Sequence, residues 1–521
     1  MKLRMVILLM AVFLMAASAA MVLDTPALTL AAATSAAATS CEALTALILP
    51  NTTITSSQMV APGKFAPPTR AEETTNAYAN LPAFCRVAAT LKPTTDSDIR
   101  IEVWMPASGW NNKFQAVGNG GWAGSISYGG LAAAVRGGYA GASTDTGHQG
   151  NTAAFGMGHP EKLIDYSYRA VHEMTVQAKA IIHAYYGDAP NLSFWNGCST
   201  GGHQGHVEAA RYPADFDGIV AGSPGLNWTR LHVARMAINA IVHRSEESDI
   251  PASKYPMIHE AVLQACDALD GVKDGVIENP TRCHFDPKVL ACKGADGPDC
   301  LTAAQVETVR ALYAPVKNPQ TGAEVEPALL QPGSELGWAT LAGPVPLVNA
   351  REAFKFLIYK DPSWDWHTFN PATDIDRALK TDTGLVDLQD VNLKPFFDRG
   401  GKLLMYHGWA DPQVTAMGSV EYFNDIVKQL GKGVVGKSVQ LYMVPGMNHC
   451  GGGPGTGTFD KMAVIEQWVA TGTAPDQIVA SHLTAGNVDR TRPLCPYGKV
   501  ATYKGTGSTD DAANFSCAAA R

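Results

Sequence analysis

Two cysteines set beside reactive residue types constrain this chain more than any other feature of its sequence. Cys198 directly precedes Ser199, and Cys450 directly follows His449. A disulfide holds its two Cα atoms about 4.4–6.8 Å apart, so a bond between these cysteines would bring the serine and the histidine into one small volume. Because a serine hydroxyl is activated by a neighbouring base, the pattern predicts a hydrolase whose nucleophile and base are joined covalently.

The chain has ten cysteines, an even number that is typical of paired cysteines in an exported protein. Spacing alone does not fix which of them pair. The most economical arrangement joins near neighbours, which leaves Cys198 for Cys450; the local pairs are then Cys41–Cys85, Cys266–Cys283, Cys292–Cys300 and Cys495–Cys517. A zinc site is disfavoured, because the sequence contains no Cys-x-x-Cys pair.

The first residues have the three-part layout of a secretory signal. Lys2 and Arg4 precede an apolar run at 5–15, and small residues follow at 16–20. The apolar run is too short to span a bilayer as a helix. We therefore predict a signal peptide and flexible leader over residues 1–40, with no fixed cleavage site. The mature protein would be secreted or periplasmic, with no membrane attachment.

Composition narrows the class of partner. The formal net charge is -8 at pH 7, and 46% of the residues are hydrophobic against 17% charged. These values are ordinary for a globular enzyme, and they give no basic field of the kind that binds nucleic acid. We expect a small organic substrate and no nucleic-acid partner. The sequence sets no oligomeric state.

The order of predicted elements indicates an α/β fold with an insertion. Short β-rich runs alternate with helical stretches over 85–223 and again from residue 401, as in parallel α/β architectures. Insertions at the carboxyl edge of an open sheet lie over the active site. We therefore predict a lid domain at 226–396 and one catalytic domain made of 41–225 and 397–521. Among the strands, we expect 99–105 to be half-exposed and 113–117, 192–195, 403–406 and 439–444 to be strands of the sheet.

The pentapeptide at 197–201 matches the G-x-S-x-G pattern of a nucleophile turn. A predicted strand precedes it and a helix-compatible run at 202–211 follows it. The two glycines let the chain turn sharply, so the hydroxyl of Ser199 stands clear at the end of the strand. We predict that Ser199 is the nucleophile.

A serine nucleophile needs a base and a third group that orients the base. Asp411 and His449 each follow a predicted strand through a short loop. The chain order Ser199, Asp411, His449 is the order that α/β-hydrolases use, which predicts this fold and this triad. Other histidines and aspartates lack the same placement and are weaker candidates: His203, His206, His407, Asp387, Asp390 and Asp398.

The negative oxygen that forms during ester cleavage needs about two preorganised donors. The backbone N–H of Thr200, at the expected helix start, is one of them. The glycine loop at 118–122 follows an early strand and is placed to supply the other. We assign Gly120 and Gly121 to this oxyanion hole, and the sequence does not decide between them.

A loop in the predicted lid bunches three carboxylates and two glycines within 266–276. Oxygen-rich loops of this kind bind hard cations such as calcium. The loop is not an EF-hand, because its spacing differs and no glutamate closes it. A solvated acidic turn is the alternative. The candidate ligands are the side chains of Asp267, Asp270 and Asp274 and the carbonyls of Val272 and Val276.

Together these residues resemble the tannase and feruloyl esterase family of serine hydrolases, which includes hydrolases of mono(2-hydroxyethyl) terephthalate. The resemblance extends over about 41–517 and rests on Cys198-Ser199, Asp411, His449-Cys450, Gly201-Gly202 and the run RYPADFDG at 211–218. It implies an α/β-hydrolase fold with a lid inserted before the acid. It also implies a disulfide joining the cysteines beside the serine and the histidine, and a structural calcium ion in the lid.

The same resemblance implies a carboxylic ester hydrolase that uses no organic cofactor and acts on small esters of galloyl, hydroxycinnamic or terephthalic acids. His203 departs from the arginine expected in many relatives, so a contact near the nucleophile differs. Trp338, Trp364 and Trp366 suit either an aromatic-binding wall or the core of the lid, and no role is assigned. The alternatives are a hydrolase of other esters or peptides on this fold, or a noncatalytic secreted binding protein.

Overall fold

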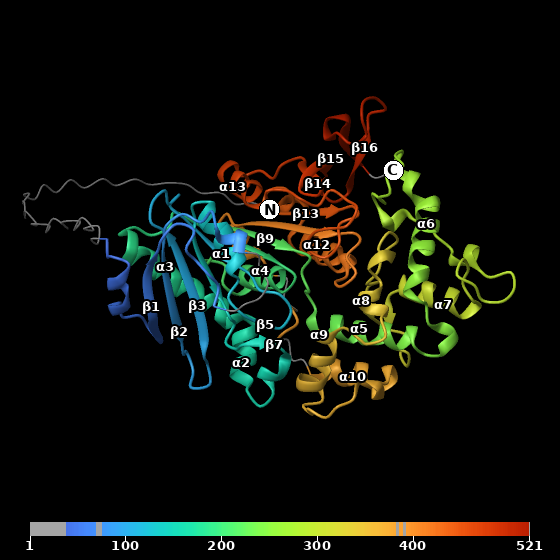
Figure 1. Ribbon diagram of the computed structural model, residues 1–521, viewed down its shortest axis with the longest axis horizontal. Coiled ribbons are helices and arrows are strands. Elements are labelled where there is room, and N and C mark those ends of the chain that lie inside the picture. The colour runs from blue at the N-terminus through green and yellow to red at the C-terminus, as the bar shows by residue number, and fades with distance from the viewer. Residues whose placement is uncertain (1–37, 69–74, 382–384, 389–391, 520–521) are drawn as a thin grey trace, which may run out of the picture. The chain divides into compact units, whose positions relative to one another are not determined.

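The computed structural model describes residues 38–68, 75–381, 385–388 and 392–519 (Figure 1). The predicted signal peptide lies outside the described residues, as does Asp390. Residues 37–521 form one compact unit. In the part of the chain that the structure describes, no helix combines the length and the apolar character needed to cross a membrane.

The centre of this unit is a nine-stranded mixed sheet with the strand order β1-β2-β3-β6-β4-β8-β9-β12-β13. Neighbouring strands are antiparallel from β1 to β6 and parallel from β6 to β13. The strands are β1 (Thr52–Val60), β2 (Phe84–Leu91), β3 (Ile99–Pro106), β4 (Lys113–Val117), β6 (Ala140–Thr144), β8 (Leu192–Cys198), β9 (Gly218–Gly222), β12 (Lys402–Gly408) and β13 (Val439–Val444).

The expectation that 99–105 is half-exposed was wrong. Every residue of β3 is buried except Arg100. The strand lies inside the sheet between β2 and β6. Its two faces pack against different clusters, with Val103 in one and Trp104 in the other. The alternating polar side chain Glu102 is buried because it pairs with Arg86 on β2.

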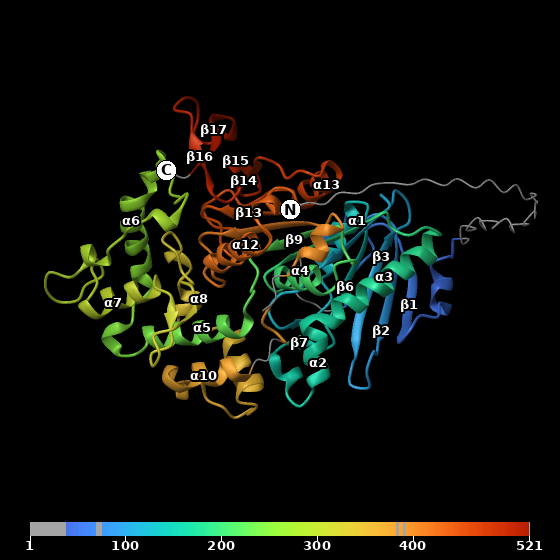
Figure 2. The same ribbon diagram turned by 180° about the vertical axis from the view of Figure 1, so that it is seen from behind.

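Helices cover both faces of the sheet, as the alternation along β12 demonstrates. Leu403 and Met405 pack in the cluster that contains α3 and α12, whereas Leu404 and Tyr406 pack with α13. Successive side chains of a strand point to opposite faces, so the sheet is buried on both sides; Figure 2 shows α3 across one face. These helices are α1 (Tyr128–Arg136), α3 (Ala170–Tyr186), α4 (Thr200–Arg211), α11 (Lys394–Asp398), α12 (Ala416–Leu430) and α13 (Lys461–Thr471); the short helix α2 (Pro160–Ile164) precedes α3 in the chain.

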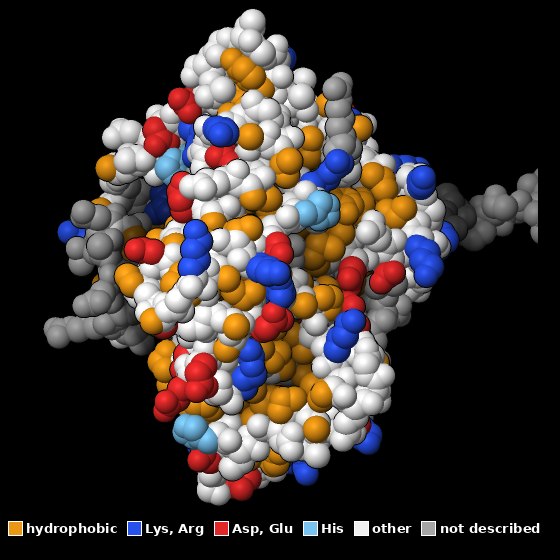
Figure 3. Space-filling model, turned by 90° about the vertical axis from the view of Figure 1, so that its right-hand side faces the viewer, with side chains coloured by type: hydrophobic (Ala, Val, Ile, Leu, Met, Phe, Trp, Pro, Cys, Tyr) orange, Lys and Arg blue, Asp and Glu red, His pale blue; other side chains and the backbone are white. Residues whose placement is uncertain are grey.

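The segment between β9 and β12 is largely helical and has a hydrophobic cluster of its own. Figure 3 shows the right-hand side of Figure 1, and on this face acidic and basic side chains are intermingled with hydrophobic ones. The boundaries 226 and 396 of the lid remain a prediction. The lid elements are α5 (Trp228–Val242), α6 (Tyr255–Cys266), α7 (Ala303–Leu312), α8 (Ala339–Ala342), α9 (Val348–Glu352), α10 (Pro371–Thr381), β10 (Val316–Lys317) and β11 (Glu324–Glu326).

Four two-stranded sheets complete the fold of the described residues. Two of them follow β13, a third joins loops that precede α1 and α2, and the fourth is the β10–β11 pair. The strands of the first three are β5 (Ala123–Gly124), β7 (Gly150–Asn151), β14 (Ile478–Thr484), β15 (Asn487–Leu494), β16 (Lys499–Tyr503) and β17 (Phe515–Ala519).

All ten cysteines are paired, and the pairing is the one predicted. Cys198 and Cys450 are bonded with their Cα atoms 6.0 Å apart. This bond joins the end of β8 to the loop after β13, across a sequence separation of 252 residues that contains the lid. The local pairs are Cys41–Cys85, Cys266–Cys283, Cys292–Cys300 and Cys495–Cys517.

Candidate active site

Ser199 occupies a sharp turn between β8 and α4. Its backbone has φ 63° and ψ -121°, a strained conformation of the kind that a nucleophile turn imposes. The close approach of the chain requires glycine beside it, because a Cβ on Gly197 would lie 2.3 Å from the carbonyl oxygen of Gly201. The turn therefore presents the serine at the carboxyl end of the central parallel strands.

The structure brings Ser199, His449 and Asp411 together in a hydrogen-bonded chain. Ser199 Oγ lies 2.8 Å from His449 Nε2, and His449 Nδ1 lies 2.6 Å from Asp411 Oδ2. A carboxylate only accepts hydrogen bonds, so Nδ1 carries the imidazole hydrogen. Nε2 is then the acceptor for the serine hydroxyl, which is the arrangement that general-base activation requires.

Asp411 is fully buried and well supplied with donors. Its Oδ1 accepts the backbone N–H groups of Gln413 and Val414 at 2.8 and 3.0 Å. Its Oδ2 lies 3.2 Å from His407 Nε2, in addition to the bond with His449. Burial alone would raise the pKa of the Asp411 carboxyl, but the charges and hydrogen bonds of His449 and His407 outweigh it and hold the pKa well below its usual range. The carboxylate is therefore ionised throughout the neutral range.

His407 has a place that the sequence did not indicate. It lies in β12, fully buried, with Nδ1 2.7 Å from the hydroxyl of Ser419 and Nε2 facing both Asp411 and the carbonyl of Val414. Because both groups facing Nε2 are acceptors, this nitrogen carries the hydrogen. His407, a rival for the role of base, is thus bonded to the acid.

The other rivals lie elsewhere. His203 and His206 are buried within α4, and burial, aided by the charge of His203, lowers the pKa of His206 to about 3. Asp387 accepts the backbone N–H of Thr229 at 2.6 Å. Asp398 forms an ion pair with Lys394 on the same helix at 2.7 Å.

The three residues assigned to the oxyanion hole border the same cavity as Ser199. Thr200 is the first residue of α4, so its backbone N–H has no acceptor within the helix. Among the described residues, the backbone N–H groups of Gly120 and Gly121 have no backbone acceptor. The carbonyl of Gly121 is held by the hydroxyls of Thr200 and Tyr166 at 2.9 and 2.7 Å, which fixes the glycine loop beside the nucleophile.

The cavity at Ser199 has a volume of about 360 Å³. Three of its lining residues come from helix α5 and were missed by the sequence analysis: Trp228, Leu231 and Arg235. Only the spacing of these residues on one helix could have suggested them. Trp338, by contrast, is fully buried in the lid between Tyr255 and Tyr313. A larger cavity of about 990 Å³ beside β1–β3 shares Gly120 and Asn151 with this one, but Ser199 and His449 border the smaller one.

In the acidic loop of the lid, backbone N–H groups donate hydrogen bonds to carboxylates of the same loop. Asp267 accepts the N–H groups of Asp274 and Gly275 at 3.3 and 3.1 Å, and Asp270 accepts that of Val272 at 2.9 Å. Burial and the neighbouring carboxylates raise the pKa of Asp270 to about 6. A second side of the loop contacts β15, where Arg490 and Arg492 pair with Asp274. Asp267 is buried, whereas Asp270 and Asp274 are half-buried, and carboxylate and carbonyl oxygens are the ligand types that a hard cation takes.

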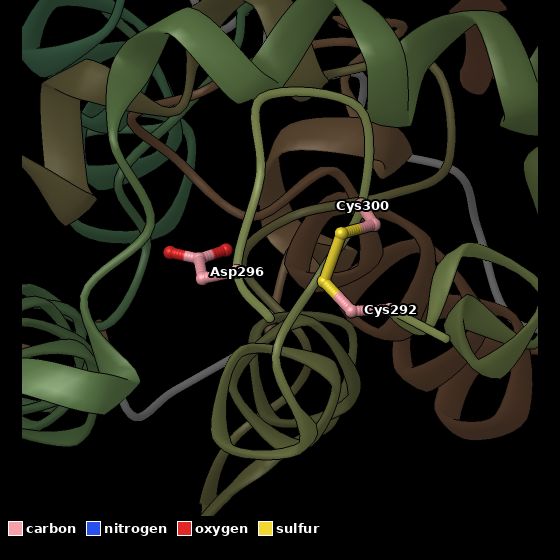
Figure 4. Close-up of side chains that lie close together, drawn as sticks. All are labelled: Cys292, Asp296 and Cys300. Atoms are coloured by element: carbon pink, nitrogen blue, oxygen red, sulfur yellow. A yellow bond between two sulfur atoms is a disulfide. The ribbon is translucent and has the colours of Figure 1, made fainter. Parts of the chain in front are cut away.

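A second group in the lid has ligand-type side chains but does not suit a metal ion. Cys292, Asp296 and Cys300 lie close together (Figure 4). The two sulfur atoms are bonded to each other, and the Asp296 carboxylate pairs with Lys254 at 2.6 Å. The group is therefore a disulfide beside an ion pair.

A serine, a histidine and an aspartate in this order and geometry, at the carboxyl edge of a sheet with this topology, define an α/β-hydrolase. Residues 85–518 match the family model described as "Tannase and feruloyl esterase". The chain belongs to this family, and it is a carboxylic ester hydrolase.

Individual relatives are similar over most of their length. An uncharacterised esterase of Xanthomonas campestris pv. campestris is 37% identical, with 91% of this chain and 90% of the relative covered. Mono(2-hydroxyethyl) terephthalate hydrolase of Piscinibacter sakaiensis is 32% identical, with 85% and 86% covered. The crystal structure of feruloyl esterase B from Aspergillus oryzae has a TM-score of 0.84 at 29% identity, with 92% of this chain and 99% of that chain covered.

Proposed function

We propose that this esterase hydrolyses small esters of aromatic acids through an acyl-enzyme on Ser199. The observation that carries the proposal is the unbroken chain of hydrogen bonds from Ser199 through His449 to the buried Asp411. A noncatalytic binding protein on this fold would have no use for this chain or for a strained serine at the turn.

The mechanism follows from the positions of the protons. Ser199 Oγ attacks the ester carbonyl carbon while His449 Nε2 takes the hydroxyl proton, and Asp411 stabilises the resulting imidazolium. The N–H groups of Thr200 and of Gly120 or Gly121 hold the negative oxygen. Collapse breaks the bond to the alcohol, which leaves with the proton from His449. Water then attacks the acyl-enzyme with His449 as base, the aromatic acid departs, and the proton returns to Ser199.

The aromatic preference is supported by the cavity wall and by the relatives. Trp228 borders the cavity and is itself packed on Trp122, with ring centroids 5.0 Å apart at 27°. A fixed aromatic surface favours the ring of a substrate acid. Two of the relatives are named for aromatic esters, one as a probable feruloyl esterase and the other as a mono(2-hydroxyethyl) terephthalate hydrolase.

A substrate panel tests this proposal. We expect kcat/KM for methyl gallate, methyl ferulate, chlorogenate or mono(2-hydroxyethyl) terephthalate to exceed that for methyl butyrate by at least about 100-fold, a gap of roughly 3 kcal/mol. Equally slow hydrolysis of all four aromatic esters and of the aliphatic control would refute the aromatic assignment. Ser199→Ala provides the background rate.

We also propose that the protein is exported and that the acidic lid loop binds one structural calcium ion. Five disulfides support an oxidising compartment. For the ion, the carboxylates of Asp267, Asp270 and Asp274 and the carbonyls of Val272 and Val276 would be the ligands. The bound ion would offset the charges of Asp267 and Asp270, which have no ion-pair partner among the described residues, and would fix the loop against β15.

A further inference from the structure

Helix α5 presents an aromatic, an aliphatic and a cationic side chain to the catalytic cavity. Trp228, Leu231 and Arg235 all border it, and their positions i, i+3 and i+7 lie on one face of the helix. With a rise of about 1.5 Å per residue, Arg235 begins roughly 10 Å along the axis from Trp228. The wall of the cavity therefore changes from apolar to positively charged along this helix.

The guanidinium of Arg235 is buried and has donors to spare. The residue is 4% exposed. Nε and Nη2 donate to the carbonyl of Gln413 at 3.0 and 2.8 Å, and Nη1 lies 3.3 Å from His232 Nδ1. A guanidinium has five N–H groups, so these bonds leave two of them without a partner among the described residues.

Within the described residues, no carboxylate forms an ion pair with Arg235. Asp411 and Glu326 act on it only through space, and the oxygens of Asp411 are occupied by other donors. Burial raises the pKa of Glu326 well above its usual value, which favours the neutral form of this side chain. Burial lowers the pKa of Arg235 to about 10, which keeps the guanidinium charged. A buried charge without a bonded counter-ion is costly, and an entering anion would remove that cost.

We propose that Arg235 is a specificity-determining residue that binds a carboxylate carried by the ester, at the end of the acid remote from the scissile bond. The planar fork of a guanidinium matches a carboxylate in two-point geometry, and Trp228 and Leu231 would pack on the ring between the two ends. The inference rests on the proposed function for the identity of the bond that is cleaved. It adds that the preferred esters are anions.

Binding to the Ser199→Ala variant tests the proposal without turnover. The two ligands are mono(2-hydroxyethyl) terephthalate and 2-hydroxyethyl 4-carbamoylbenzoate, which has the same shape but a neutral amide in place of the carboxylate. We expect isothermal titration to give at least about 10-fold tighter binding of the anion, since hydrogen bonds to charged groups are the stronger ones. Adding Arg235→Gln should reduce this preference to less than about 2-fold.

Two further variants make the result unambiguous. Arg230→Gln removes the same charge from an exposed position on the same helix and should leave the preference intact. Arg235→Lys preserves the charge without the fork and should retain a reduced preference, which also covers the case in which Arg235→Gln does not fold.

Three results would overturn the inference. These are equal binding of the two esters to Ser199→Ala, a preference that persists in Arg235→Gln, and an equal loss of affinity for both esters in that variant. The last would show that Arg235 only holds Gln413 and the loop of the acid. Failure of the wild type to hydrolyse any of the four aromatic esters of the panel faster than methyl butyrate would refute the proposed function, yet it would leave the binding result valid.

Discussion

Asp411 is the residue on which the geometry of the site depends. Four donors converge on its buried carboxylate, and two of them are histidines. From the sequence, His407 was a weaker rival of His449 for the role of base. Only the fold shows that the two imidazoles bind the same carboxylate, one facing the nucleophile and the other facing away from it.

Replacing His407 should weaken catalysis without removing the nucleophile or the base. His407→Phe deletes one hydrogen bond to a buried charged group, worth about 1.5–3 kcal/mol. We expect kcat to fall by about 10- to 100-fold with KM changed by less than about 3-fold. Because Asp411 loses a donor, its pKa should rise and activity should be lost at a higher pH on the acid side. The pH profile of kcat is the measurement.

Ser419→Ala is the matched control for this prediction. It removes the hydroxyl that contacts the other nitrogen of His407 and leaves the bond to Asp411 in place. Its kcat should stay within about 5-fold of the wild type. A His407→Phe variant with wild-type kcat and an unshifted pH profile would show that His407 only fills space.

At the scale of elements, helix α4, which follows Ser199, contains a buried histidine that makes the stability of the fold depend on pH. His206 in α4 is fully buried, and neither ring nitrogen has a hydrogen-bond partner among the described residues. Its pKa is lowered to about 3, against about 6.5 in the unfolded chain. Between these values the unfolded state binds the proton and the folded state does not, so stability is complete above about pH 6.5 and declines as the pH falls.

His206→Phe should reduce this dependence on pH. From pH 7 to pH 5, protonation of the unfolded histidine costs the wild type about 2 kcal/mol that the variant does not lose. Urea unfolding at the two pH values measures the difference, and other titrating groups cancel between the two proteins. Identical losses of unfolding free energy in the two proteins would contradict the account.

The acidic loop is a second element with a measurable consequence. If the crowded carboxylates of Asp267, Asp270 and Asp274 hold calcium, purified protein should contain one calcium ion per chain. Removal with EGTA should lower the melting temperature by several degrees, and calcium should restore it. Absence of calcium by elemental analysis, with no thermal shift on its addition, would sink the proposal.

Asp270→Asn is the matched variant for the loop. It replaces one carboxylate oxygen by an amide nitrogen, which removes the negative charge at nearly unchanged size. It should therefore weaken calcium binding and abolish most of the thermal shift. Asp286→Asn, in the same part of the chain but exposed, should leave the shift unchanged.

At the scale of the molecule, apolar strand patterns predicted five of the nine strands of the central sheet, since strands buried on both faces are continuously hydrophobic; β1, β2, β6 and β9 were not predicted. The order of Ser199, Asp411 and His449 indicated the α/β-hydrolase site for the same reason, because each residue follows such a strand. The burial of 99–105 was misjudged, because its polar positions suggested solvent and the partner Arg86 was not visible in the pattern. Arg235 was missed, because the sequence of an inserted helix does not show which of its faces borders the cavity at the edge of the sheet.

The Cys198–Cys450 bond acts at this scale, because it joins two halves of the sheet across the whole lid. In the chain-entropy model, closing so long a loop in the unfolded chain adds about 5 kcal/mol to the free energy of unfolding. We expect Cys198→Ala with Cys450→Ala to lower the melting temperature and to lose kcat at temperatures where the protein is still folded, since His449 is no longer held beside Ser199. Cys292→Ala with Cys300→Ala, which opens a short lid loop, is the control. An unchanged kcat in the first variant would show that the bond is only structural.

The identity of the nucleophile is the central claim, and covalent labelling tests it most directly. A fluorophosphonate probe should modify one residue per chain, and peptide mass analysis should place the label on Ser199. Ser199→Ala should take up no label and should hydrolyse aromatic esters at least about 10⁴-fold more slowly. Label on a different residue, or ester hydrolysis within 10-fold of wild type in Ser199→Ala, would contradict the account.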